Sequence, residues 1–143
     1  MARMGWIGLL LLALAVSTVV IGAPPERLDR AKIPDDLEVP AAASARQNPQ
    51  RPTPENIAEG KKYFASQCAM CHGADGKGKG DLAISLGMRV PDFTDVQRGS
   101  NRTDGDLFYV LTNGHGDMPG EGEDRLSERV RWNMILYLRS FAS

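Results

Sequence analysis

The sequence predicts an all-α domain at the C-terminal end of the chain, over residues 54–143. Three stretches place apolar side chains at helical spacing behind residues that favour helix N-termini, and no stretch shows a convincing strand pattern. Residues 73–99, in the middle of this region, are rich in glycine and lack a strong period, so we expect a loop there. The predicted fold is therefore three or more short helices joined by long loops.

Each expected helix starts at a residue that can cap it. Thr53 precedes Pro54, whose missing amide is tolerated in a first turn, and residues 103–106 form a capping-box pattern. Ser127 can cap the last helix, and the second helix is expected to end at residues 113–114, Asn-Gly. The side chains at helical spacing are Ile57, Gly60 and Phe64; then Leu107, Phe108, Val110 and Leu111; then Val130, Met134, Leu138 and Phe141.

Residues 1–23 are predicted to be an export segment. The stretch from Met4 to Ala23 is nearly all apolar and has the length of about 20 residues that a membrane-spanning helix needs. We expect an uncleaved transmembrane anchor, because Pro24 and Pro25 follow directly where a signal peptidase would cut. The alternative is a cleaved signal peptide that releases a soluble periplasmic domain. Both interpretations place the folded domain on the periplasmic, outer side of the membrane.

Residues 24–53 are predicted to be a linker. They hold six of the nine prolines and the small-residue run 41–45, a composition that cannot fill a core. The alternative is a segment ordered along a partner subunit, with Ile33, Leu37 and Val39 as its anchors. The domain that follows has little aliphatic content for its length, so we expect a buried prosthetic group to complete its core. The formal net charge of −1 gives no basic field, and no nucleic-acid partner is expected.

The two cysteines of the chain belong to one local motif. Cys68, Cys71 and the adjacent His72 form the pentapeptide C-x-x-C-H, which in an exported protein indicates a c-type haem attachment site. Each thiol can add to one vinyl group, and the histidine then lies beneath the iron. A thioredoxin-like dithiol would need a βαβ context. A zinc site would need about four ligands, and the chain offers only His115 besides the motif. A structural disulfide would explain neither the histidine nor the glycine-rich loop.

With these residues, the domain resembles a class I, single-haem cytochrome c over residues 53–143. Gly60 and Phe64 stand at the spacing of the family's first helix, which the last helix crosses through an aromatic side chain that Tyr137 would supply. Residues 73–80 resemble the family's glycine-rich turn. The resemblance implies a cytochrome c-like fold around one covalent haem c. The proline that often follows this turn in the family is replaced here, and Pro91 is the later candidate for the carbonyl that holds the second ring nitrogen of the histidine.

The resemblance also implies a methionine as the second axial ligand of the iron. Met118, followed by Pro119 on a loop before the last helix, fits in kind and in place. Met134 has core spacing, and Met88 lacks a proline turn, so these are the weaker alternatives. His115 would instead give bis-histidine ligation and a lower reduction potential. We therefore predict covalent haem at the two cysteines and axial ligation by His72 and Met118.

If protein side chains fill both axial positions of the haem iron, no coordination site is open to a substrate. The expected chemistry is then outer-sphere transfer of single electrons, without enzyme catalysis. We expect a membrane-tethered carrier between a quinol-oxidising complex and an oxidase or photosynthetic reaction centre. The alternative is a permanently docked cytochrome c subunit of a respiratory, photosynthetic or dehydrogenase complex. A haem enzyme or gas sensor would need an open iron site, against which the Met-Pro turn argues.

The charges of the domain are unevenly distributed along the chain. Acidic residues dominate between Asp104 and Glu128, whereas lysines 61, 62, 77 and 79 surround the attachment motif. If the acidic residues form one face near Met118, that face would dock a basic patch of a redox partner. The alternative is that they are solvated or cap helices.

Overall fold

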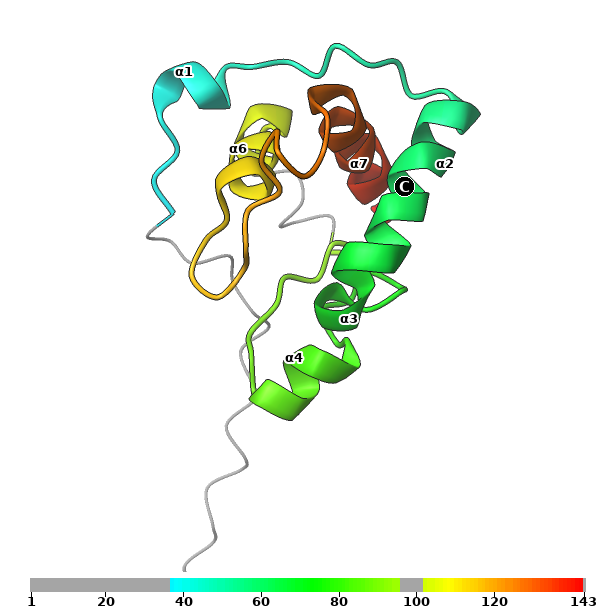
Figure 1. Ribbon diagram of the computed structural model, residues 1–143, viewed down its shortest axis with the longest axis vertical. Helices are drawn as coiled ribbons and strands as arrows, with labels where there is room; N and C mark the ends of the chain where they lie inside the picture. Colours follow the sequence, from blue (N-terminus) through cyan, green and yellow to red (C-terminus); the bar gives the residue numbers. More distant parts are fainter. Residues whose placement is uncertain (1–36, 96–101, 143) are drawn as a thin grey trace, which may run out of the picture.

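The structure is a computed structural model that describes residues 37–95 and 102–142 (Figure 1). Its helices are α1 (Ala41–Ser44), α2 (Pro54–Tyr63), α3 (Ala69–His72), α4 (Asp81–Leu86), α6 (Asp104–Asn113) and α7 (Glu128–Ser140). A π-helical turn, η1 (Phe64–Cys68), joins α2 to α3. In these two ranges the extended pairing is limited to one isolated bridge between His115 and Met118. The predicted all-α fold class is confirmed.

All three predicted helix starts are confirmed. The Thr53 hydroxyl accepts the Asn56 backbone N–H at 3.3 Å, with Pro54 in the first turn of α2. A complete capping box opens α6, in which the Thr103 hydroxyl accepts the backbone N–H of Asp106 at 3.0 Å and the Asp106 carboxylate accepts that of Thr103 at 2.9 Å. Ser127 caps α7. These starts follow from short-range hydrogen bonds, which is why a local pattern predicts them.

The α2 and α7 helices cross closely at Gly60. A Cβ at this position would overlap the backbone carbonyl of Asn133. One turn beyond Gly60, at the start of η1, the Phe64 ring meets Tyr137 edge-on, with ring centroids 5.3 Å apart. The predicted glycine and aromatic crossing is therefore confirmed.

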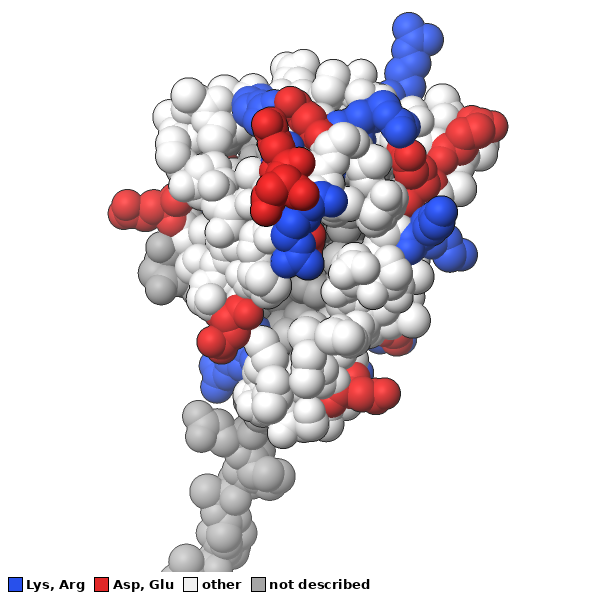
Figure 2. Space-filling view, viewed as in Figure 1, with Lys and Arg blue, Asp and Glu red and all other residues white. Residues whose placement is uncertain are grey.

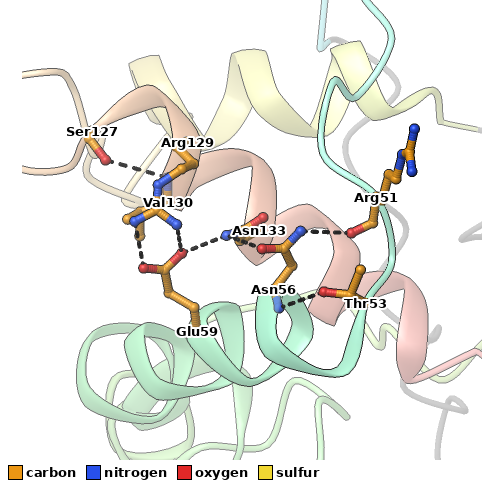
Figure 3. Close-up of polar contacts among 8 residues, drawn as sticks. All are labelled: Arg51, Thr53, Asn56, Glu59, Ser127, Arg129, Val130 and Asn133. Atoms are coloured by element: carbon orange, nitrogen blue, oxygen red, sulfur yellow. Dashed lines mark hydrogen bonds and ion pairs between the residues drawn. The ribbon is translucent and has the colours of Figure 1, made fainter.

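Polar side chains close the edge of this crossing (Figure 3). The Arg129 guanidinium donates two hydrogen bonds to the Glu59 carboxylate, at 2.6 and 2.8 Å, and the Asn133 amide donates a third at 2.5 Å. Asn133 is fully buried. Since a buried amide N–H group is costly unless it is hydrogen-bonded, the bond that Asn133 donates to Glu59 favours this arrangement of the two helices.

A core of apolar side chains lies mainly between α6 and α7. Trp132 and Met134 are each 1% exposed, and the rings of Phe108 and Trp132 stack with centroids 4.0 Å apart. The core also takes in Leu111, Leu126, Val130 and Ile135. Met134 is therefore a core residue, as its spacing predicts.

Two expectations about irregular segments need correction. The predicted loop over residues 73–99 contains α4, which begins after Gly80 and ends at Gly87, a glycine with φ of +64°. The expected linker is also packed over part of its length, because residues 40–50 lie along α6 and α7 (Figure 1). We call residues 40–50 the strap. Its contacts are made by main-chain carbonyls and polar side chains, so its low apolar content does not reveal them.

The described residues hold no helix long and apolar enough to cross a membrane. Residues 1–23, for which we predict an export segment and anchor, lie outside the described ranges.

Candidate haem-binding site

The attachment motif is presented by the end of the α2–η1–α3 helical segment. Cys68 is the last residue of η1, and Cys71 and His72 close α3 before Gly73 turns the chain away with φ of +76°. The two thiols are not joined in a disulfide. Burial raises the pKa of Cys68 to about 11, and the negative charge of Glu121 adds to this effect. The motif thus combines two available thiols with a histidine one residue further on.

His72 is held in an apolar environment. Burial lowers the pKa of His72 to about 4, so the imidazole is neutral, as a metal-ligating histidine must be. Its Nδ1 atom is buried and has no hydrogen-bond partner among the described residues. A buried ring nitrogen without a partner is rare in a folded protein, and it fits a histidine whose environment is completed by a bound group.

Aromatic side chains from three parts of the chain surround His72. Phe93 stacks on the imidazole with ring centroids 5.0 Å apart, and Phe64 lies at 6.2 Å. The Phe141 ring contacts the Phe64 ring, with centroids 5.4 Å apart, and stacks on the Phe93 ring, with centroids 6.5 Å apart. Sequence reasoning did not identify Phe93. The available signal was that it is the single aromatic residue between positions 73 and 99.

The Pro91 carbonyl lies close to the turn that follows His72. The Gly78 backbone N–H donates to the His72 carbonyl at 2.8 Å, and a Cβ on Gly78 would lie 2.8 Å from the Pro91 carbonyl oxygen. The structure contains no hydrogen bond from His72 Nδ1 to this carbonyl. Pro91 therefore lies near the turn after His72. Its predicted role as the acceptor for the second ring nitrogen of His72 stays a prediction.

Met118 lies on a tight turn after α6. Its backbone N–H donates to the His115 carbonyl, and the His115 N–H donates back to the Met118 carbonyl, both at 3.0 Å. The Met118 side chain is partly buried and packs against the same core as Cys68. The predicted second ligand and the attachment motif thus border one core. Met88, by contrast, follows α4, and its backbone N–H bonds Ala83.

The acidic residues near Met118 do not form one free acidic face. Asp106 and Glu121 are buried, at 7% and 8% exposed. Ion pairs join Asp104 to Arg139, Glu121 to Arg125, Glu123 to Arg131 and Glu128 to Arg46. Figure 2 shows acidic and basic side chains interleaved over the upper part of the face it presents. Pairing of this kind weakens the long-range field on which the predicted docking of a basic patch depends.

The uncharged part of that face lies next to the attachment motif. The lobe that α4 occupies at the bottom of Figure 1 carries charged side chains only at its margins in Figure 2. Exposed large apolar side chains in the described ranges are confined to α3 and α4, namely Met70, Leu82, Ile84 and Leu86. The surface around the attachment motif is therefore more apolar than charged.

Sequence comparison now identifies the family. The family described as cytochrome c oxidase, cbb3-type, subunit III matches residues 55–138, which is more than half of the chain. The chain belongs to this cytochrome c family. It is accordingly a c-type cytochrome, an electron carrier and not an enzyme, with one covalent haem c for which Cys68 and Cys71 are the cysteines available.

Two solved structures, one of them described as a c-type cytochrome, are similar to this cytochrome. A chain of the Kuenenia stuttgartiensis reducing HAO-like protein complex Kustc0457/Kustc0458 is 31% identical, with a TM-score of 0.57 over 66% of the present chain. The present chain spans about half, 47%, of that chain. The KustC0563 c-type cytochrome is 24% identical, with a TM-score of 0.51, and 59% of the present chain covers 98% of it. No curated protein matches the chain significantly.

Proposed function

We propose that this cytochrome carries single electrons on the outer side of a membrane, with His72 and Met118 as the axial ligands of its haem iron. The observation that carries the ligand assignment is that Met118 and Cys68 pack against one core, while His72, four residues after Cys68, has a buried Nδ1 atom without a hydrogen-bond partner among the described residues. When bound, the haem supplies a one-electron couple between ferric and ferrous iron, and a thioether ligand favours the ferrous state.

The residues of the chain set the conditions for this chemistry. His72 offers a neutral ring nitrogen without losing a proton, because burial has already removed the competing charged form. The Met118 turn is closed by two backbone hydrogen bonds, so the side chain is presented from a fixed position. The aromatic side chains around His72 keep water away from that side of the site.

The proposed partners are membrane complexes. The apolar N-terminal stretch supports a tether, and a tethered carrier would run between a quinol-oxidising complex and an oxidase or reaction centre. The alternative is a permanently docked subunit. It is favoured by the 31% identity to a chain that was solved as part of a protein complex.

Ligand substitution tests the assignment of the iron ligands. Met118→Ala should remove the weak sulfur-to-iron band in the red of the ferric spectrum and open the iron to cyanide, while the haem stays covalently attached. Met134→Leu and Met88→Leu are the matched controls and should keep the band, because leucine fills nearly the same volume without offering a sulfur. Loss of the band in a control and its survival in Met118→Ala would assign the ligand to another methionine.

The state of the protein in its native membranes separates the two functional alternatives. After mild detergent extraction, a mobile carrier should migrate as a small particle, whereas a docked subunit should stay with a large complex. The intact mass tests the tether, because a mature chain that begins near Ala23 would exclude an uncleaved anchor.

A further inference from the structure

The strap lies outside the part of the chain that the family shares, because the family match begins at residue 55. It nevertheless makes specific contacts with both helices that flank the core. These contacts join it to α6, which leads directly into the Met118 turn.

The strap approaches the N-terminal end of α6 through its main chain. A Cβ on Gly105 would overlap the Ala43 carbonyl and would lie 2.7 and 2.9 Å from the carbonyl oxygens of Ser44 and Arg46. The Thr103 hydroxyl donates to the Ser44 carbonyl at 2.7 Å. The strap can therefore lie this close only because position 105 is glycine.

The strap also binds α7. The Asn48 side-chain amide donates to the Trp132 carbonyl at 3.0 Å, and the Arg46 guanidinium forms an ion pair with Glu128. The same guanidinium lies over two stacked rings, 4.5 Å from the centroid of Phe108 on α6 and 5.1 Å from that of Trp132 on α7. One side chain of the strap thus contacts an aromatic ring from each helix.

The other end of α6 carries the Met118 turn. The Glu121 N–H donates to the Leu111 carbonyl at 2.7 Å, and a Cβ on Gly120 would lie 2.5 Å from the Thr112 carbonyl oxygen. The turn is therefore built directly on the last residues of α6. Since α6 has ten residues and so spans about 15 Å, a tilt at its strap end displaces the turn at its other end.

We propose that the strap is a positioning element for Met118, because it holds α6 against α7 and so fixes where the Met118 turn stands. Arg46 and Gly105 are its principal residues. Two contacts from α7 also hold α6 in place. Arg139 forms an ion pair with Asp104 at 2.8 Å, and Arg131 donates a hydrogen bond to Thr112, also at 2.8 Å. The inference rests on the proposed role of Met118 as an iron ligand and assigns a function to a segment that the family match leaves out.

The test uses the full haem-loaded chain and measures the affinity of the ferric protein for cyanide, which competes with the methionine ligand. Arg46→Ala should bind cyanide roughly 3- to 10-fold more tightly, because loss of one cation–π and ion-pair contact shifts such an equilibrium by about this factor. Arg46→Lys retains a cation and should restore part of the wild-type affinity. Gly105→Ala, which displaces the strap main chain, should act in the same direction.

A matched control separates positioning from stability. Glu59→Gln weakens the α2–α7 contact, away from α6, and should lower the melting temperature while changing cyanide affinity less than Arg46→Ala does. Gln47→Ala, at an exposed strap position, should change neither. Equal cyanide affinities in Arg46→Ala and Glu59→Gln would overturn the proposal and leave the strap as a stabilising segment. If Gly105→Ala fails to load haem, the Arg46 variants still decide.

The same measurements keep the two proposals apart. If Met118→Ala keeps its red band, the ligand assignment fails and the strap proposal fails with it. If Met118→Ala loses the band but Arg46→Ala behaves as wild type, only the strap proposal fails.

Discussion

The backbone carbonyl of Asn133 occupies the place where a side chain at position 60 would begin. Any residue other than glycine would push α2 away from α7 at the crossing. Because the attachment motif continues directly from α2 through η1, this contact also places the haem-binding residues relative to the core.

Gly60→Ala should therefore destabilise the haem-loaded protein. Helix propensity alone would make alanine more stable by about 1 kcal/mol, so the sign of the effect reports on the crossing. We expect a loss of about 2–4 kcal/mol in the free energy of unfolding, and a fall of roughly 10 °C or more in melting temperature. Ala58→Gly, on the exposed side of the same helix, should cost only about 1 kcal/mol. A melting temperature for Gly60→Ala equal to that of the wild type would contradict the close crossing.

The sequence predicts best the features that depend on neighbouring residues. Thr53, Thr103 and Ser127 cap their helices as expected because a cap is satisfied within three residues of the chain. The attachment motif is equally local. Gly60 and Phe64 are predictable because the family resemblance supplies their distant partner, α7.

Features that depend on distant polar contacts were not predictable. Arg131 is 1% exposed, and its position between Thr112 and the Phe108 ring depends on α6, which is about twenty residues away in the sequence and leaves no local signal in α7. The strap was missed for a related reason. Its contacts use the Arg46 cation and carbonyl groups, which leave no apolar pattern. The α4 helix was hidden by the glycines on either side of it.

The Glu59 network predicts a pH-dependent stability. Burial alone would raise the pKa of Glu59, but hydrogen bonds from Arg129 and Asn133, together with nearby positive charge, outweigh it and lower this pKa. A carboxyl with a lowered pKa stabilises the fold above its unfolded pKa of about 4.3, and the contribution is lost as the pH falls through the folded pKa. Glu59→Gln should lose about 1–2 kcal/mol at pH 7, and the difference from the wild type should vanish at low pH.

Denaturant unfolding of the two proteins between pH 7 and pH 3 measures this difference. Asp124→Asn removes the same charge from an exposed side chain and is the matched control for net charge. A difference between wild type and Glu59→Gln that stays constant over the whole pH range would mean that the carboxylate charge contributes nothing to the network.

Glu121 is expected to lower the reduction potential of the haem. Its side chain is 10% exposed, and its charge acts on Cys68, one of the two residues that hold the haem. A buried negative charge stabilises ferric iron relative to ferrous iron, and it is screened little by salt. Glu121→Gln should therefore raise the potential, by roughly tens of millivolts for a charge near the site in a medium of intermediate dielectric constant.

Equilibrium redox titration at two salt concentrations tests this prediction. Asp124→Asn removes the same charge three residues away, from an exposed side chain, so its shift should be small and should shrink further at high salt. Arg125→Gln removes the cation that pairs with Glu121 at 3.1 Å. The negative charge of Glu121 is then no longer offset by this cation, so the reduction potential should shift downward. A potential that is unchanged in Glu121→Gln, or that moves as little as in Asp124→Asn, would show that this carboxylate does not tune the haem.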